Sequence, residues 1–176
     1  MRSGFIAVIG RANAGKSTLI NVMVGEKVSI VSPKPQTTRD RILGVLTEDD
    51  YQIVFVDTPG IYKARNALTD MMMRTTETSA RSVDFILYVL DGHDGIGEED
   101  FELIRKYKGL DIPMAVAYTK IDIMPKENIP ADMAKFSDAN MDLDVFPVSA
   151  RKGTNVRRLK EFLAANMPEG EKVFGQ

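Results

Sequence analysis

Two glycines, a lysine and a serine are spaced along residues 10–17 in an order that suits phosphate chemistry. The segment reads GRANAGKS, matches G-x-x-x-x-G-K-[ST], and directly follows the apolar run Phe5–Ile9. Glycines let backbone N–H groups come close to phosphate oxygens, and a following helix adds its positive N-terminal end. In this pattern the lysine reaches the β- and γ-phosphates and the hydroxyl binds Mg²⁺. We therefore predict phosphate contacts from Gly10, Asn13, Ala14, Gly15, Lys16, Ser17 and Thr18.

A carboxylate and a glycine follow the apolar run Tyr51–Val56, in the segment Asp57–Gly60. Alone, this DTPG segment fits an ordinary Asx-turn after a strand equally well. Behind a phosphate loop, the aspartate can support the Mg²⁺ shell, and Gly60 can offer its N–H to a γ-phosphate. The polar loop before residue 41 can add a threonine hydroxyl, with Thr38 preferred over Thr37. The predicted metal residues are Ser17, Thr38 and Asp57, and Lys16, Thr38 and Gly60 are predicted to be catalytic.

Two further motifs, TKID at Thr119–Asp122 and SAR at Ser149–Arg151, also follow apolar runs. A carboxylate only accepts hydrogen bonds, and guanine offers an N1–H and an exocyclic amine where adenine has no matching donors. Asp122 therefore favours guanine, and Lys120 can lay its aliphatic stem along the base. Each motif alone is common in loops, so it is their order at successive strand ends that indicates a guanine-nucleotide site. The predicted nucleotide-binding residues in these two motifs are Thr119, Lys120, Asp122, Ser149, Ala150 and Arg151.

Alternating apolar runs and helical patterns must position these motifs. The expected strands are Phe5–Ile9, Ile42–Leu46, Tyr51–Val56, Phe85–Leu90, Pro113–Tyr118 and Val145–Val148. The expected helices are Lys16–Val24, about Asn66–Ser82, Glu98–Lys108, a stretch near Ala131–Ala139, and Asn155–Met167. Only four residues join the second strand to the third, which suits an antiparallel hairpin because parallel neighbours need a crossover. We predict an α/β P-loop NTPase fold with a six-stranded, mostly parallel sheet, one antiparallel edge strand and helices on both faces.

Composition excludes several classes of protein. The 176 residues carry a formal net charge of −2 and no cysteine. That charge argues against a basic module that coats nucleic acid, so we expect no DNA partner and only limited RNA contact from this chain. No segment approaches the ~20 apolar residues of a membrane span, and the N-terminus lacks a secretory signal. The absence of cysteine excludes thiol chemistry and suits a reducing cytoplasm.

Taken together, the motifs resemble those of the Era family, within the TrmE-Era-EngA branch of the translation-factor-class GTPases. The five G motifs of that family correspond to Gly10–Ser17, the Thr37-Thr38 loop, Asp57–Gly60, Thr119–Asp122 and Ser149–Ala150. The stretch most specific to the family is VSIVSPKPQTTRDRILGVLT, Val28–Thr47. Relatives of the Der and MnmE types usually carry a Gly-Thr-Thr-Arg version of it, and DTAG in place of DTPG. The resemblance implies a G domain that binds GTP and GDP with Mg²⁺ and hydrolyses GTP.

The resemblance also implies a domain plan and a cellular role. Residues 1–168 correspond to the family's N-terminal G domain, and residues 169–176 are expected to be a linker stub toward a C-terminal KH domain. In the family that KH domain binds the 3′ end of 16S rRNA; it is missing here, which implies a truncated chain. The implied role is assembly of the small ribosomal subunit in the cytoplasm, with peripheral association at the inner membrane face left open.

Two residues, Ala12 and Thr119, depart from the family pattern, and Ala12 mildly so, in place of the proline common in the family. Thr119 stands in place of the usual asparagine, so affinity is expected to fall while Asp122 keeps the choice of base. Ile61 occupies the place of the Ras-type catalytic glutamine, and its side chain cannot hydrogen-bond, which predicts slow intrinsic turnover. The family replaces part of that help with a monovalent cation, which makes Asn13 the candidate ligand for K⁺ and a fourth catalytic candidate. An ordinary loop residue is an equally good interpretation of Asn13.

Other functions stay open on the sequence alone. A P-loop kinase or ATPase shares the phosphate loop, although the carboxylate of TKID argues against it. A nucleotide-binding scaffold with little hydrolysis is suggested by Ile61. Within the branch, a Der- or MnmE-like role is the remaining alternative.

Overall fold

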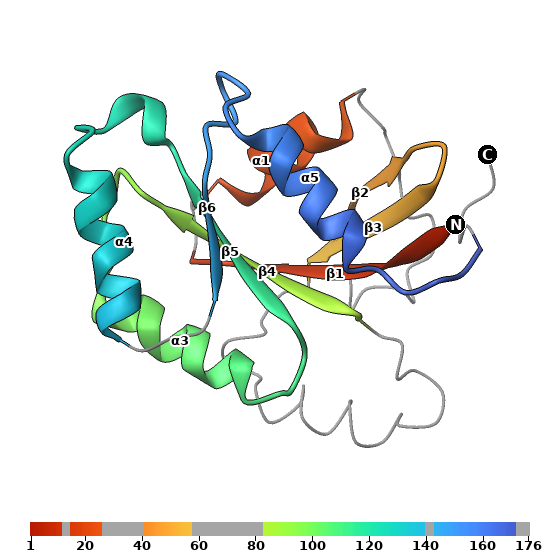
Figure 1. Cartoon of the computed structure of the whole chain (residues 1–176), viewed down its shortest axis with the longest axis horizontal. Helices are drawn as coiled ribbons and strands as arrows, with labels where there is room; N and C mark the ends of the chain where they lie inside the picture. Colours follow the sequence, from red (N-terminus) through yellow and green to blue (C-terminus); the bar gives the residue numbers. More distant parts are fainter. Residues whose placement is uncertain (12–14, 26–40, 58–82, 140–142, 172–176) are drawn as a thin grey trace.

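A six-stranded sheet forms the centre of the molecule in the computed structural model, which describes residues 1–11, 15–25, 41–57, 83–139 and 143–171 (Figure 1). The strand order is β2-β3-β1-β4-β5-β6. Every neighbouring pair is parallel except β2 with β3, which places the antiparallel strand β2 at one edge. The strands are β1 Arg2–Ile9, β2 Arg41–Thr47, β3 Tyr51–Asp57, β4 Phe85–Asp91, β5 Met114–Thr119 and β6 Asp144–Pro147.

The central strands consist of apolar residues because both of their faces are covered. β4 is buried from Phe85 to Leu90, and β5 is buried along its whole length. Near-continuous apolar runs of this kind are typical of parallel strands between two helical layers. The hairpin between β2 and β3 turns through Glu48, Asp49 and Asp50, which are exposed.

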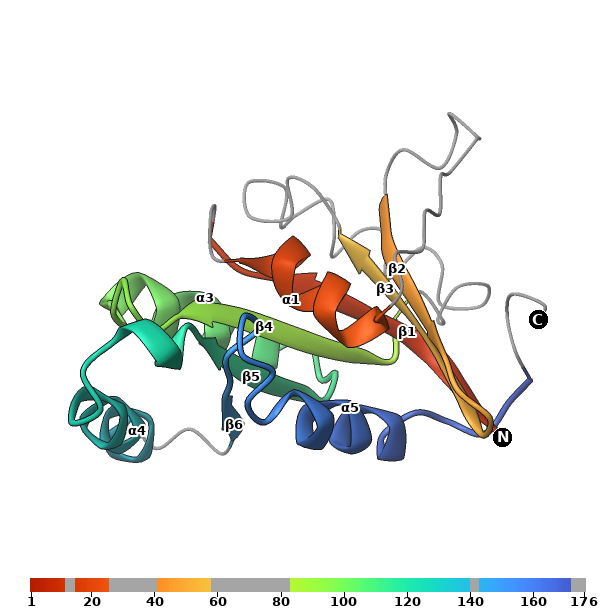
Figure 2. The same ribbon diagram turned by 90° about the horizontal axis from the view of Figure 1, so that it is seen from above.

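The helices cover opposite faces of the sheet. α1 (Lys16–Val24) and α5 (Val156–Ala165) lie side by side on one face, where Leu19, Ile20 and Leu159 are fully buried (Figure 1). α3 (Glu98–Lys108) and α4 (Asn128–Asp138) complete a second apolar cluster on the other face, with the rings of Phe101 and Phe136 5.4 Å apart. Seen from above, α3 and α5 lie on opposite sides of the strands (Figure 2). Two packed clusters, one on each face, therefore fix the loops at the strand ends.

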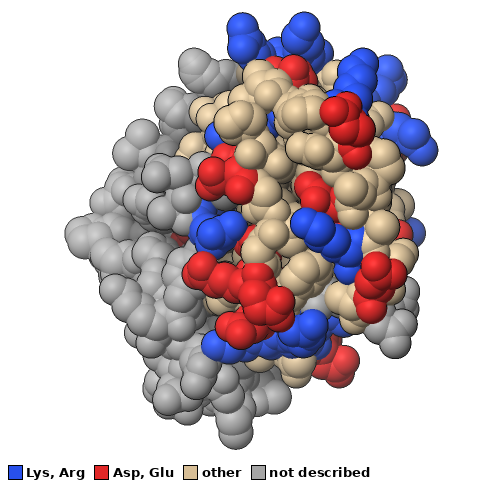
Figure 3. Space-filling view, turned by 90° about the vertical axis from the view of Figure 1, so that its left-hand side faces the viewer, with Lys and Arg blue, Asp and Glu red and all other residues tan. Residues whose placement is uncertain are grey.

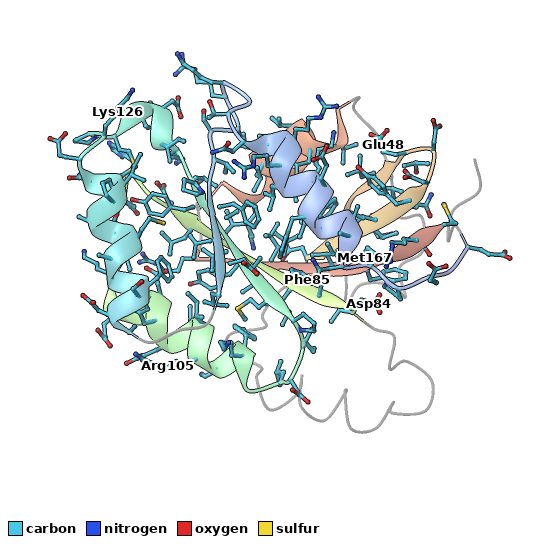
Figure 4. The ribbon with its side chains drawn as sticks, viewed as in Figure 1. Glu48, Asp84, Phe85, Arg105, Lys126 and Met167 are labelled. Atoms are coloured by element: carbon cyan, nitrogen blue, oxygen red, sulfur yellow. The ribbon has the colours of Figure 1, made fainter. Side chains whose placement is uncertain are left out.

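The segment after α5 returns to the beginning of β1. The N–H of Ser3 donates to the carbonyl of Pro168 (3.0 Å), and the N–H of Gly170 donates to that of Met1 (3.1 Å). A Cβ on Gly4 would lie 2.7 Å from Asp84 Oδ2 and 2.8 Å from Met167 Sδ, so a larger residue here would displace these two side chains. Asp84 and Met167 lie together beside β1 in Figure 4.

The hydrogen bonds of this returning segment continue to Glu171, whose carbonyl accepts from Ser3 Oγ at 2.7 Å. They therefore extend into the range where the sequence predicted a linker. Residues 172–176 lie outside the described part of the chain.

The predicted fold is confirmed, with small shifts at the element ends. α1 and α3 begin and end as predicted, whereas β1 starts earlier, at Arg2, and α4 begins at Asn128. α5 ends at Ala165 rather than Met167, because its last turn tightens before Pro168, which cannot continue a helix. The short 3₁₀ helix η3 (Ile121–Ile123) was not predicted, and the predicted helix Asn66–Ser82 lies outside the described residues. Within the described residues, no helix is both long and apolar enough to span a bilayer.

Candidate functional site

A pocket of about 550 Å³ opens at the carboxyl ends of β1 and β5, beside the N-terminus of α1. Three separate stretches of the chain line it: the start of α1, the end of β5 with η3, and the loop after β6. In open α/β sheets ligands bind at this edge. The lining residues are Gly15, Lys16, Ser17, Thr18, Thr119, Lys120, Asp122, Ile123, Ala150 and Arg151.

Asp122 is held in place by the loop after β6. Ser149 Oγ donates to Asp122 Oδ1 (2.9 Å) and itself accepts from the N–H of Lys152 (3.0 Å). Ser149 is fully buried beneath the pocket, and the N–H of Ile121 donates to the carbonyl of Val148 (3.4 Å). One carboxylate oxygen of Asp122 is thus engaged by a fixed hydroxyl, which sets the orientation in which the carboxylate lines the pocket.

Lys120 and Thr119 bond to the end of the neighbouring strand β4. Lys120 Nζ donates to Asp91 Oδ2 (2.8 Å), and Lys120 itself adopts a left-handed backbone conformation with φ of 66°. Such a conformation is uncommon for a residue with a side chain and clusters at functional sites. Thr119 Oγ1 donates to the carbonyl of Leu90 (3.1 Å). The other oxygen of Asp91 accepts from the N–H groups of His93 and Asp94, so this carboxylate is fixed on both sides.

Tyr118 supports the same loop from beneath. Its ring is fully buried, and its hydroxyl donates a hydrogen bond to Asp132 of α4. Burial, and then the hydrogen bond to this carboxylate, raise the pKa of the Tyr118 hydroxyl above its ordinary range. A Cβ on Gly92 would lie 2.8 Å from this ring and 2.7 Å from the carbonyl of Thr119. Glycine is therefore required where the β4 loop crosses the end of β5.

The start of α1 forms the other side of the pocket. Gly15 has a φ of 93°, a left-handed conformation that favours glycine, and its carbonyl accepts the first helical bond from Leu19. Lys16 Nζ lies 3.4 Å from Asp57 Oδ1 at the end of β3, and both side chains are largely shielded from solvent. Gly10 is buried at the end of β1, while Ser17 and Thr18 are exposed in the pocket.

The oxygen donors in this part of the site suit Mg²⁺. Ser17 lines the pocket, and Asp57 contacts the ammonium of Lys16, which lines it too. Within the part of the chain that the structure describes, no group of three or more His, Cys, Asp or Glu side chains could hold a metal ion alone. Magnesium sites beside phosphates commonly use one or two protein oxygens and complete the shell with phosphate and water. The present donors fit that arrangement.

The structure brings together most of the predicted site residues that it describes. Asn13, Ala14, Thr37, Thr38 and Gly60 lie outside the described residues, as does Ile61. The sequence interpretation missed Ile123, which lines the pocket, and Asp91, which pairs with Lys120. The position of Asp91 directly after a strand, before Gly92, was a usable signal, because the carboxyl ends of neighbouring parallel strands meet at one edge.

The side of the molecule formed by α3 and α4 carries charges of both signs. Among the described residues of this face, blue and red side chains are interspersed, with no broad area of one sign (Figure 3). α3 itself has acidic residues in its first turn and Arg105, Lys106 and Lys108 in its last turn, an order that complements the helix dipole.

Comparisons with known proteins agree with this geometry. The family model described as 50S ribosome-binding GTPase matches residues 5–120. The chain is 43% identical over 173 residues to GTPase Era of Caldanaerobacter subterraneus subsp. tengcongensis, a match that covers 98% of this chain and 58% of that protein. The chain thus spans less than two thirds of the length of the curated relative.

Two solved structures of Era superpose on nearly the whole chain. A variant of Aquifex aeolicus Era bound to GDP·AlF4⁻ has a TM-score of 0.75 and 38% identity, covering 99% of this chain and 60% of that one. Era in complex with MgGDPNP and nucleotides 1506–1542 of 16S ribosomal RNA has a TM-score of 0.76, with the same identity and coverage. The resemblance to Era found in the sequence is thereby confirmed. The chain belongs to the family of 50S ribosome-binding GTPases.

Proposed function

We propose that the chain is a GTP-binding and GTP-hydrolysing molecular switch of the Era type. The observation that carries the proposal is a single pocket lined by Lys16 and Ser17 on one side and by Asp122 on the other. Groups suited to phosphate and a group suited to guanine therefore face the same space. A nucleotide can span them both.

Base selection follows from Asp122. Its carboxylate accepts from the N1–H and the exocyclic amine of guanine, while the Ser149 hydroxyl keeps it oriented. Adenine would leave these acceptors without donors, a mismatch that can reduce binding by up to ~10⁴-fold. Lys120 flanks the base with its aliphatic stem, and a backbone N–H near Ala150 donates to O6.

Lys16, Ser17, Asp57 and Thr38 hold the triphosphate and Mg²⁺. Lys16 exchanges its contact with Asp57 for the β- and γ-phosphates, and Asp57 and the two hydroxyls then contribute to the metal shell. When bound, the ion neutralises charge on the phosphate oxygens. The residues assigned to catalysis are Lys16, Thr38 as a metal ligand, and Gly60, whose N–H would donate to the γ-phosphate.

Hydrolysis is direct attack of water on the γ-phosphorus. The water oxygen forms the new bond, the bond from the γ-phosphorus to the β–γ bridging oxygen breaks, and its electron pair leaves with GDP. The water proton goes to the phosphate released. Ile61 cannot orient the attacking water through its side chain, so intrinsic turnover is slow.

A monovalent cation would supply part of the missing charge, and Asn13 is the residue that would hold it. The expected result is faster turnover in K⁺ than in Na⁺, measured as phosphate release under single-turnover conditions. Asn13→Ala should remove that response. A rate and a K⁺ response unaltered in Asn13→Ala would exclude this role for Asn13.

The cellular role proposed is assembly of the small ribosomal subunit. The family description names the 50S subunit, whereas the Era structure that superposes here was solved with 16S rRNA nucleotides. We favour the small subunit because that structure covers 99% of this chain at 38% identity. Residues 1–168 act as the G domain, residues 169–176 lead toward an RNA-binding KH domain, and the protein works in the cytoplasm or peripherally on the inner membrane face.

Calorimetric titration with GTP, GDP and ATP in Mg²⁺ tests the nucleotide assignment. GTP and GDP should bind, and ATP should compete at least ~10³-fold less well. Equal or stronger binding of ATP would favour a P-loop ATPase or kinase instead. Binding of 16S rRNA fragments by a longer protein that includes the KH domain separates an Era-type role from a Der- or MnmE-type role.

A further inference from the structure

Arg11, the second residue of the phosphate loop, reaches across to a buried carboxylate on α3. Its Nε donates to Asp100 Oδ1 at 3.0 Å, and its Nη2 donates to Asp100 Oδ2 at 2.9 Å. The guanidinium therefore forms a bidentate pair with the carboxylate, a geometry that fixes the orientation of the two groups as well as their distance. The Asp100 side chain is only 2% exposed, and that of Arg11 is 36% exposed.

Asp100 is itself fixed by β4 and by the N-terminal cap of its own helix, α3. The hydroxyl of Tyr88 in β4 donates to Asp100 Oδ1 at 3.0 Å, and the N–H of Gly97 donates to Asp100 Oδ2 at 3.0 Å. Each carboxylate oxygen thus accepts two hydrogen bonds. A buried carboxylate with this many partners is costly to disturb, because removing one partner leaves charge or a donor without compensation.

We propose that Arg11 and Asp100 are positioning residues for the phosphate side of the pocket. The inference rests on the proposed function. Arg11 follows Gly10 at the end of β1, and the same connection leads to Gly15 and Lys16 at the start of α1. Anchoring Arg11 to α3 fixes the point at which the chain leaves β1 before nucleotide arrives, so less ordering is needed when phosphate binds.

Asp100→Asn distinguishes the positioning role from a purely electrostatic one, because the two roles change GDP affinity in opposite directions. If Arg11 and Asp100 acted only through charge, Asp100→Asn would remove a negative charge near the phosphates and strengthen GDP binding. If they position the connection, Asp100→Asn weakens GDP binding despite the removed charge. Arg11→Lys keeps the charge and removes the bidentate geometry, so it separates the same alternatives.

The experiment is calorimetric titration of Asp100→Asn, Arg11→Lys and the double variant with GDP and with GMP. Each single change should weaken GDP binding by about tenfold, the size expected for loss of a charge-assisted hydrogen bond. GMP, which lacks the β-phosphate, should change by less than about threefold. Because both changes break the same interaction, the double variant should bind GDP about as weakly as the single variant with the lower affinity. Arg157→Ala, which removes an exposed 3.4 Å ion pair with Glu161 on α5, is the matched control and should leave both affinities unaltered.

Two further measurements, on Tyr88→Phe and by hydrogen exchange, keep the test decisive if Asp100→Asn or Arg11→Lys does not fold. Tyr88→Phe keeps the ring and removes the hydroxyl that donates to Asp100, and should weaken GDP binding by a smaller factor in the same direction. In nucleotide-free protein, the amide of Lys16 should exchange faster in Asp100→Asn than in Arg157→Ala. The inference would be overturned if Asp100→Asn and Arg11→Lys bound GDP as tightly as the parent or tighter, or lost equal affinity for GDP and GMP. GDP binding by the parent chain would still uphold the proposed function. A parent chain that binds no GDP would overturn both.

Discussion

The two sides of the pocket are organised in different ways. The base side, which we define as Thr119, Lys120, Asp122 and Ser149, is cross-linked by its own hydrogen bonds to β4 and the loop after β6. The phosphate side, defined as Lys16, Ser17 and Asp57, has opposite charges at 3.4 Å that nucleotide and metal would separate. A neutral base needs acceptors held in one place, whereas a charged phosphate needs counter-charge that can change partners. On the proposed function, the acceptors for the base are thus fixed by the fold before nucleotide binds, and the phosphate side holds an ion pair that nucleotide would replace.

Removing the base-side carboxylate should have the largest effect. Asp122→Ala deletes the acceptor for both guanine donors, so the ratio of GDP to ADP affinity should fall by roughly 10³-fold or more. Competition binding with unlabelled GDP and ADP measures that ratio. Asp138→Ala, an exposed carboxylate on α4, is the control and should leave it unaltered. A preserved preference for guanine in Asp122→Ala would refute the assignment of the base side.

Neutralising the phosphate-side carboxylate should have the next largest effect, with a sign that depends on Mg²⁺. In Asp57→Asn the gain in GDP affinity produced by Mg²⁺ should shrink by about 10- to 100-fold, as expected for a charge-assisted contact. Without Mg²⁺ the same variant should bind GDP as well as or better than the parent, because Lys16 no longer has a competing partner. Titrations with Mg²⁺ and with EDTA measure both quantities. If Mg²⁺ raised the GDP affinity of Asp57→Asn as much as that of the parent, the role given to Asp57 on the phosphate side would be wrong.

Removing the hydroxyl that orients Asp122 should have a smaller effect. Ser149→Ala deletes the 2.9 Å bond to Asp122 Oδ1 while leaving the carboxylate in place. GDP affinity should fall by about 5- to 10-fold, equivalent to ~1 kcal/mol, and guanine should still be preferred. Calorimetry on this variant and on Ser137→Ala, an exposed serine of α4, tests the prediction. A loss as large as that of Asp122→Ala would mean that Ser149 contacts the nucleotide itself.

The smallest effect on binding should come from Tyr118→Phe, which alters the support of the base side. Loss of the bond to Asp132 should lower the free energy of unfolding by about 1–2 kcal/mol at neutral pH, with GDP affinity changed less than about twofold.

The pH dependence of this variant has a definite sign. Because the pKa of Tyr118 is raised in the folded state, its contribution is full below the ordinary tyrosine value of about 10 and is lost as pH rises above it. Thermal melts from pH 8 to 11 should therefore show a shallower alkaline decline in Tyr118→Phe than in the parent. Parallel declines would contradict the shift.

Much of the fold and the pocket could be predicted from local patterns. Features that depend on residues close together in the sequence can be predicted from it. They include the strands, the hairpin at Glu48–Asp50 and the helix caps at Gly15 and Gly25. Parallel strands also bring their carboxyl ends to one edge by construction, which allowed TKID and SAR to be grouped before the structure. Ile123 was missed because the 3₁₀ turn that directs it to the pocket leaves no clear periodic pattern.

The partners of the charged side chains could not be predicted. Asp100 looks like an ordinary acidic residue in the first turn of a helix, and only packing brings it to Arg11, 89 positions away. Lys120 looks like a base-flanking residue, yet its ammonium bonds to Asp91 from the neighbouring strand. Charged residues carry no periodic signal for their partners, because long side chains can reach several acceptors and the backbone decides which one is near.

By itself the sequence determined the alternation of strands and helices, the antiparallel edge and the residue types offered to phosphate, metal and base, since these follow from local spacing and burial. Tertiary structure alone decided which groups meet. It tied Asp122 to Ser149, Lys16 to Asp57 and Arg11 to Asp100, because directional hydrogen bonds form only where packed elements bring donor and acceptor within about 3 Å.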